Sequence, residues 1–389
     1  MTNLSFGVPL KKYTTFKIGG PATAFAELND PQQLPDLLAY AEAEGWPVLI
    51  LGGGSNMLVS DRGFDGLVIH ISNIGIEQQD AGENEVLLRV GSGEVWDGVV
   101  KYAVDRQLWG IENLSRIPGR MGAFAVQNVG AYGPEAKDVV VEVEVFDLKE
   151  REFKVLTNAE CDFSYRKSIF NTTEKGRYVI FHTTIKLSRV PKPNIGYPDV
   201  KKRFEGIEQP EIADIRHAIK DIRDAKFPFP EESVEGNAGS FFKNSVIDQE
   251  QYDALLESFR QHLPQHVERL EQIRHKFPTA EGIKIPSAFI MEVCELKGFT
   301  MGNVQLNPTQ PVVVLNKNGN ASAHEVLSLV REVRRIVRDK TGLHLYTEPE
   351  FIGFTQDGLI KYGFNDEELA RYCPHASLLD QAGDDTSIE

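Results

Sequence analysis

Cysteine, basic side chains and long apolar runs are all scarce in this chain, and each shortage excludes a class of protein. Among 389 residues the only cysteines are Cys161, Cys294 and Cys373, too few and too far apart for a disulfide framework, so we expect a reducing, cytoplasmic location. Lysine and arginine number 42 against 57 acidic residues, and the net charge of −15 argues against nucleic-acid binding. Because no run of about 18 apolar residues occurs, and the opening residues lack a signal-peptide core, we expect no membrane partner.

Metal ligands in a recognisable spacing are also missing. The nearest approach is the pair His262 and His266, but Pro264 between them breaks the helix that would align them. No CxxC motif or further histidine completes a tetrahedral set, so we predict no metal site.

Helical periodicity and strand alternation predict an α+β protein that begins with a small mixed unit. Residues 24–72 have the pattern strand, helix, strand, strand, with Asp30 and Pro31 placed to cap and open the helix. Strand patterns then dominate from residue 86 to residue 187, interrupted by one helix and by a glycine-rich loop at 118–133.

The second half of the chain alternates helices and loops. Residues 188–210 are rich in proline, lysine and glutamate, which is typical of a linker or an exposed loop. Helical patterns follow at 212–226 and 249–277, and the capping box that begins at Ser322 opens another helix. The tail, residues 366–389, carries seven acids and one base, so we predict that it is poorly ordered or loosely docked.

A first glycine-rich loop, residues 52–56, follows a buried strand and is a candidate ligand-binding segment. It is not a dinucleotide-binding fingerprint, because Met57 stands where a third glycine is needed and the segment that follows looks like strand and turn. Three glycines can nevertheless expose several backbone N–H groups in a concave nest that binds phosphate. A tight turn without a ligand is the alternative for this pattern.

A second glycine-rich loop, residues 117–133, strengthens the case for a ligand. Its glycines permit close backbone approach, and Gln127 and Asn128 supply amide groups suited to the edge of a heteroaromatic ring. Together the two loops suit a long ligand with a pyrophosphate and a planar ring. For any one glycine, a structural turn remains the alternative.

Six sequence blocks in this order resemble a known family. They are KYTTFKIGGPA (12–22), LGGGSNMLV (51–59), IPGRMGAFAVQNVGAYG (117–133), CDFSYRKSIF (161–170), GNAGSFFKN (236–244) and TEPE (347–350). The family is UDP-N-acetylenolpyruvoylglucosamine reductase, the flavoenzyme of peptidoglycan synthesis called MurB, and the resemblance covers about residues 5–353. The N-terminal two-thirds alone would imply only the broader fold shared with vanillyl-alcohol-type oxidases, whereas the last three blocks point to the reductase.

The resemblance implies a fold and a set of partners. The fold is the FAD-binding fold of the vanillyl-alcohol-oxidase/PCMH type in two subdomains, residues 1–72 and 73–211. An α/β substrate-binding domain at 212–355 and an acidic extension at 356–389 complete the chain. The implied cofactor is FAD, with NADPH as co-substrate and UDP-N-acetylglucosamine enolpyruvate as substrate, and we expect a monomer.

The implied reaction has two halves. NADPH reduces FAD, and flavin N5 then delivers hydride to the enolpyruvyl group, which gives UDP-N-acetylmuramate. The site must stabilise negative charge on the enolpyruvyl carboxylate and protonate the α carbon. The matching residues are Arg166 as the cation, Ser240 as the proton donor and Glu350 as the acidic partner. Glu348 competes with Glu350, since alternate residues of a strand share a face, and only the resemblance selects Glu350.

The resemblance also assigns the binding residues. Those for FAD are Gly52, Gly53, Gly54, Ser55, Asn56, Leu58, Gly119, Gly122, Gln127, Asn128, Gly130 and Ala131. Those for the substrate are Tyr132, Tyr197, Lys226, Asn244 and Gln310. Tyr197, in NIGYPDV, points to the branch of the family whose tyrosine loop closes over the substrate.

Two other functions remain open at this stage. Another FAD-dependent oxidase or dehydrogenase of the same fold would explain both glycine loops, but it would not need Arg166 or the blocks at 236–244 and 347–350. A non-catalytic regulator that binds flavin or a nucleotide sugar would keep the fold without turnover.

Overall fold

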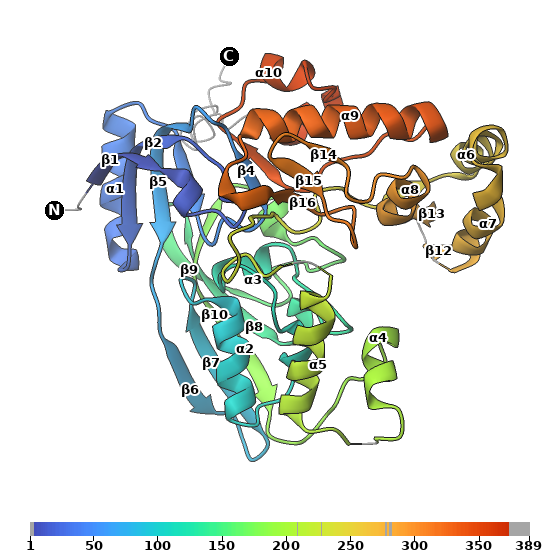
Figure 1. The fold of residues 1–389 in the computed structure, drawn as a ribbon. Helices are drawn as coiled ribbons and strands as arrows, with labels where there is room; N and C mark the ends of the chain where they lie inside the picture. Colours follow the sequence, from blue (N-terminus) through green and yellow to red (C-terminus); the bar gives the residue numbers. More distant parts are fainter. Residues whose placement is uncertain (1–3, 208, 227, 277, 280–281, 373–389) are drawn as a thin grey trace, which may run out of the picture.

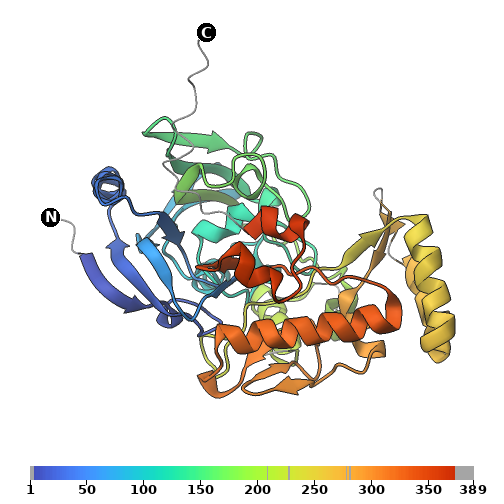
Figure 2. The ribbon, with the colours of Figure 1, turned by 90° about the horizontal axis from the view of Figure 1, so that it is seen from above.

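The computed structural model describes residues 4–372 except 208, 227, 277, 280 and 281. Two sheet-based units follow one another along the chain, and a C-terminal domain then returns to contact the first of them (Figures 1 and 2). Within the described ranges, every helix is too short or too polar to span a bilayer.

The first unit is a four-stranded sheet with a helix packed on it. Its elements are β1 (Leu4–Pro9), β2 (Pro21–Leu28), α1 (Leu34–Ala43), β3 (Val48–Leu51), β4 (Met57–Val59) and β5 (Phe64–Ile71). The strand order is β1–β2–β5–β3, with β2 and β3 both parallel to β5. The Asp30 side chain caps the turn before α1, as predicted. Strand β1 was not predicted, because four of its six side chains are exposed and no apolar face marks it.

The second unit is a five-stranded antiparallel sheet with helices on one face (Figure 1). Its strands are β6 (Ile76–Asp80), β7 (Glu85–Gly91), β8 (Val140–Asp147), β9 (Glu152–Thr157) and β10 (Tyr178–Ser188), in the order β6–β7–β10–β8–β9. Its helices are α2 (Trp96–Asp105), α3 (Gly122–Val126), α4 (Pro198–Lys201) and α5 (Ile212–Asp224). Helix α4 shows that the segment predicted as a linker contains regular structure.

Helix α5 packs on the second unit. Its buried Ile215 and Ile219 belong to the same hydrophobic cluster as Val99 of α2 and Val143 of β8. The sequence alone assigns this helix to the substrate-binding domain. The packing favours a boundary after α5, and the division into domains stays a prediction.

The C-terminal domain contains two small antiparallel sheets, of order β11–β13–β12 and β14–β15–β16, and the long helix α9. Its elements are β11 (Ser245–Ile247), α6 (Gln249–His262), α7 (Val267–Lys276), β12 (Pro278–Thr279), β13 (Gly282–Ile285), α8 (Ser287–Val293), β14 (Thr300–Met301), β15 (Val304–Leu306), β16 (Val314–Asn316), α9 (Ala323–Thr341) and β17 (Glu350–Ile352). The predicted helix break at Pro264 and the Ser322 capping box are both confirmed.

The first part of the acidic tail is firmly docked, which corrects the expectation of loose docking. Helices α10 (Gln356–Ile360) and α11 (Asp366–Tyr372) lie beside α9 in Figure 2. Arg334 of α9 forms an ion pair with Glu368 of α11, with side chains 6% and 2% exposed, and His344 Nε2 lies 3.1 Å from the other oxygen of Glu368. A charge count could not reveal that one acid of the tail faces a buried arginine. Residues 373–389, with Cys373, lie outside the described residues.

Candidate active site

The two glycine-rich loops touch each other. A Cβ atom on Gly53 would come within 2.8 Å of the Gly119 Cα atom. A Cβ on Gly119 would in turn meet the Ser55 Oγ atom at 2.7 Å, and the Gly119 φ of +113° is itself a conformation that side chains disfavour. The loops therefore form one continuous backbone surface, which only glycine at these positions allows.

Features of this surface fit the flavin nucleotide that the resemblance implies. A Cβ on Gly52 would meet no protein atom within 4 Å, so a ligand can approach the backbone there. The buried Ser92 Oγ and Asn113 Oδ1 atoms have no hydrogen-bond partner among the described residues. Ser92 packs against Gly122, where an added Cβ would lie 2.8 Å from the Ser92 Cβ. Close backbone approach and unsatisfied buried polar atoms are what a cradle for a polar ligand requires.

Two segments of the C-terminal domain extend this surface. The Glu348 N–H donates a hydrogen bond to the Phe241 carbonyl at 2.9 Å, so TEPE runs beside GNAGSFFKN. The Glu350 N–H donates to the Asn56 carbonyl at 2.9 Å, and β17 continues parallel to β4. The segments that carry Ser240, Glu350 and the first glycine loop are thus joined through their backbones. Ser240 itself is exposed.

Two buried polar residues that received no role from the sequence hold these loops. The Thr15 N–H donates to the Gly54 carbonyl at 3.1 Å, and its Oγ1 atom donates to the Asn237 carbonyl at 2.7 Å. The Asn113 Nδ2 atom donates to the Tyr132 carbonyl at 2.9 Å. The only sequence feature that could have pointed to Thr15 is its place in one of the six blocks. No sequence pattern points to Asn113.

Arg166 lies on the 161–170 loop, which is fastened to the second glycine loop. The Asn128 Nδ2 atom donates to the Ser164 carbonyl at 2.9 Å. Asn128, Tyr132 and Arg166 all have a left-handed backbone, with φ of +43°, +52° and +59°. Such conformations cost about 1 kcal/mol or more for a non-glycine residue and concentrate where function constrains the backbone.

The two candidate carboxylates have different surroundings. Lys175 Nζ lies 3.0 Å from Glu350 Oε2, and the pair joins the second unit to β17. Burial raises the pKa of the Glu348 carboxyl above its ordinary value, and the charge of Arg166 opposes that rise. The sequence analysis pairs Arg166 with Glu350 and gives Lys175 no role. In the structure Lys175 forms an ion pair with Glu350, and the charge of Arg166 acts on Glu348.

Three predicted substrate residues lie together. The rings of Tyr132 and Tyr197 meet edge to face with centroids 5.2 Å apart, and Lys226 Nζ lies 5.6 Å from the centre of the Tyr132 ring. Burial works against the charge of Lys226, but the 3.0 Å hydrogen bond to Asp199 and the electrostatic interactions with Asp199, Tyr132 and Tyr197 together outweigh it, and the pKa of Lys226 is raised. The cluster places one charged lysine over the ring of Tyr132, which in turn meets the ring of Tyr197.

Gln310 and Asn244 lie on neighbouring loops. The Thr309 Oγ1 atom donates to the Lys226 carbonyl at 2.6 Å, so the loop that carries Gln310 contacts the aromatic cluster. The Asn244 Oδ1 atom accepts a 3.0 Å hydrogen bond from the Ser287 N–H at the start of α8, which fixes the plane of the Asn244 amide.

The other predicted cofactor residues occupy the turns of the second loop and the strand after the first. Gln127 ends α3, and a Cβ on Gly130 would lie 2.7 Å from Glu135 Cγ. The Ala131 N–H donates to the Pro134 carbonyl at 3.2 Å. The side chain of Leu58 is wholly buried in the C-terminal core, so it supports the first loop from beneath.

Comparison with known proteins gives one family for most of the chain. Residues 22–154 match the model of an FAD binding domain, and residues 230–352 match the model of the UDP-N-acetylenolpyruvoylglucosamine reductase C-terminal domain. The UDP-N-acetylenolpyruvoylglucosamine reductase of Neisseria gonorrhoeae is 37% identical over 360 residues, which cover 90% of this chain and 98% of the relative. That of Chromobacterium violaceum is 38% identical over 346 residues, covering 88% and 97%. The crystal structure of the reductase (MurB) from Thermus caldophilus has the same fold, with a TM-score of 0.58 at 23% identity over 90% of this chain and 99% of that one.

Proposed function

The chain belongs to the UDP-N-acetylenolpyruvoylglucosamine reductase family, and from this we propose that it reduces the enolpyruvyl group of UDP-N-acetylglucosamine enolpyruvate to UDP-N-acetylmuramate, a step of peptidoglycan synthesis. FAD is its cofactor and NADPH its source of hydride. One observation carries the proposal: the segment of Glu350 hydrogen-bonds to the first glycine loop, and that of Glu348 to the loop of Ser240. Two of the three blocks that point to the reductase therefore lie beside the proposed flavin cradle.

The two glycine loops would hold FAD. Backbone N–H groups of residues 52–56 suit the pyrophosphate, and the amides of Gln127 and Asn128 suit the edge of the ring. Bound FAD would supply the hydride for the β carbon of the enolpyruvyl group. The protein itself must bind the enolpyruvyl carboxylate, stabilise the charge that develops there and deliver a proton to the α carbon.

Three side chains share that work in this proposal. Arg166 binds the enolpyruvyl carboxylate, because its planar guanidinium matches a carboxylate in two parallel hydrogen bonds. Glu350 acts from β17 by keeping the waters near that group oriented. Ser240 donates the proton to the α carbon, and its weakly acidic hydroxyl suffices only because the carbon that accepts the proton is strongly basic.

The aromatic cluster binds the nucleotide sugar in this proposal. Lys226 places its charge near the phosphates, and the raised pKa keeps it charged. Tyr197, 45% exposed and next to α4, closes over the substrate against Tyr132. Gln310 and Asn244 contact the sugar nucleotide from the C-terminal side.

We also propose that the enzyme works as a monomer in the cytoplasm. The buried thiols of Cys161 and Cys294 are not in disulfides, which suits a reducing compartment.

An anaerobic turnover experiment tests the function. The purified protein should be yellow, should bleach with NADPH and should regain its colour when the enolpyruvyl sugar is added. Rapid recovery with oxygen alone, without a response to the sugar, would assign an oxidase instead. A colourless protein that takes up no added FAD would support the regulator.

The contact between the glycine loops predicts the effect of a single methyl group. We expect Gly53→Ala to lose bound FAD, because the new Cβ would clash with the Gly119 backbone. A backbone atom, unlike the end of a flexible side chain, cannot rotate away from the clash. Gly53→Asp should be worse, since it adds an anion where the pyrophosphate binds. The measurement is the ratio of flavin to protein absorbance after purification. Gly98→Ala in α2 is the control, as its Cβ would meet its nearest atom at 4.0 Å and the flavin should be retained. Stoichiometric FAD in Gly53→Ala would show that the phosphate nest lies elsewhere.

A further inference from the structure

Lys175 forms an ion pair that contributes little to the stability of the fold. Its Nζ atom lies 3.0 Å from Glu350 Oε2, and the two side chains are 42% and 30% exposed. Ion pairs this exposed contribute little to folding, since water and salt screen them. The pair nevertheless connects the second unit to β17, and it ends on the carboxylate assigned to catalysis.

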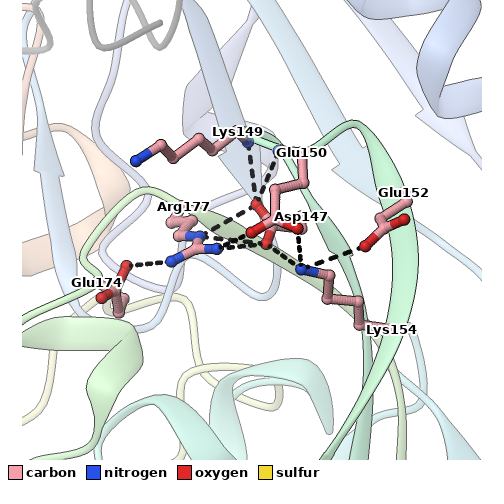
Figure 3. Close-up of polar contacts among 7 residues, drawn as sticks. All are labelled: Asp147, Lys149, Glu150, Glu152, Lys154, Glu174 and Arg177. Carbon is pink, nitrogen blue, oxygen red and sulfur yellow. Dashed lines mark hydrogen bonds and ion pairs between the residues drawn. The ribbon is translucent and has the colours of Figure 1, made fainter. Parts of the chain in front are cut away.

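The turn that carries Lys175 is held from one side by a charged cluster around Asp147 (Figure 3). The Asp147 side chain is wholly buried and accepts hydrogen bonds from Arg177 Nη2 at 2.7 Å and Lys154 Nζ at 3.0 Å. Arg177 Nη1 in turn donates to Glu174 Oε2 at 3.0 Å. Residues on both sides of Lys175 are therefore tied to one buried carboxylate.

Backbone hydrogen bonds complete this support. The Arg177 N–H donates to the Glu174 carbonyl at 3.0 Å, and the Leu148 N–H donates to the Arg177 carbonyl at 2.9 Å. The Lys175 N–H donates to the Thr172 carbonyl at 3.3 Å. The backbone of Lys175 is therefore held in place. Only the lysine side chain must lose conformational freedom for its Nζ atom to reach Glu350.

Glu350 is fixed at its backbone by a different part of the molecule. Its N–H donates to the Asn56 carbonyl on the first glycine loop, and β17 is registered on β4. This bond places the Cα atom but leaves the carboxylate able to rotate. The Lys175 contact supplies the second point that a defined carboxylate orientation requires.

The same segment that carries Lys175 also carries Arg166. Asn171 Nδ2 donates to the Arg166 carbonyl at 3.1 Å, so the two cations are linked through one short stretch of chain. Arg166 acts on Glu348, and Lys175 pairs with Glu350. If Lys175 holds Glu350, the guanidinium of Arg166 does not have to neutralise that acid and can serve the substrate.

We propose that Lys175 is a positioning residue, which holds the Glu350 carboxylate in its working orientation from the turn anchored on Asp147. This role rests on the proposed function, because it concerns the step that Glu350 serves. A misplacement of a catalytic group by about 1 Å can cost on the order of 100-fold in rate. The expected loss is therefore one of catalysis, with little loss of folding or of substrate binding.

The test compares variants of the FAD-loaded enzyme in single-turnover flavin reoxidation by the enolpyruvyl sugar. Lys175→Met should slow this step by about 10- to 100-fold, leave flavin reduction by NADPH unchanged and leave sugar affinity, read from the flavin spectrum, within about threefold. Lys175→Arg should recover most of the rate. Lys186→Met is the matched control, because Lys186 of β10 forms a similarly exposed pair with Glu85 of β7 at 3.1 Å.

The decisive arm repeats Lys175→Met in the Glu350→Gln background, where it should cost nothing further. An undiminished loss in that background, a wild-type rate in Lys175→Met alone, or an equal loss in NADPH oxidation would each overturn the proposal. Thermal unfolding of the four proteins in this cycle supplies a readout besides activity, and a large drop in Tm for Lys175→Met would show a structural role instead. Wild-type enzyme that fails to respond to the sugar would refute the proposed function itself.

Discussion

Ser240→Ala should reduce its flavin with NADPH at close to the wild-type rate but pass the hydride to the enolpyruvyl sugar about 100- to 10,000-fold more slowly. The reason is that the two half-reactions need different groups. Reduction of the flavin by NADPH delivers no proton to a substrate carbon, so it does not call on the Ser240 hydroxyl. Reduction of the sugar requires a proton at the α carbon, and a positioned donor is worth a factor of that size. Stopped-flow absorbance of the flavin measures each half-reaction separately.

Two further variants sharpen this result. Ser240→Cys, with a more acidic side chain, should exceed Ser240→Ala in proton exchange at the α carbon, which deuterium incorporation from solvent can follow. Ser245→Ala, five residues further along the same segment, is the control and should behave like wild type. Equal losses of Ser240→Ala in both half-reactions would mean that the hydroxyl supports the fold or the flavin.

Local features of the fold could be predicted from the sequence, because short-range chemistry determines them. The capping box at Ser322, the break at Pro264 and the cap at Asp30 each depend on a few adjacent residues, and all three are present. The unit on which α5 packs and the docking of α11 depend on buried partners far away in the chain. No periodicity encodes such a partner, so the docking of α11 was missed, and the domain boundary near α5 stays a prediction.

The candidate site divides in the same way. The glycines, Arg166, Ser240 and Glu350 could be named because they stand in sequence blocks that resemble those of the reductase family. Lys175 could not, since a lysine in a polar turn looks like any exposed lysine until the strand that carries Glu350 is placed beside it. Strand periodicity also put Glu348 and Glu350 on one face as equivalents, whereas burial and different cations distinguish them in the fold.

The Arg166 and Glu350 variants should show the second large effect. We expect Glu350→Gln to slow flavin reoxidation by the sugar on the order of 100-fold, because a neutral amide no longer orients the waters around the enolpyruvyl carboxylate, and misplacing a catalytic group by about 1 Å costs a factor of that size. Arg166→Lys should also be strongly impaired, because a point charge cannot grip a carboxylate with two parallel hydrogen bonds. Both residues act on one group of the substrate, so the double variant should lose little more than the worse single variant. Single-turnover reoxidation in all four proteins measures this coupling.

Glu348→Gln is the matched control for the assignment within TEPE. Burial already disfavours the charged form of Glu348, so a neutral amide of the same shape should disturb it less than the equivalent change at Glu350. Sugar binding should also survive in Glu350→Gln, since the orientation that Glu350 provides serves the reaction step and not the bound ground state. Losses that simply multiply in the double variant would show that Arg166 and Glu350 act independently. If Glu348→Gln is inactive and Glu350→Gln is active, the catalytic acid is Glu348, the carboxylate on which the charge of Arg166 acts. Lys175 would then pair with a carboxylate that has no catalytic role.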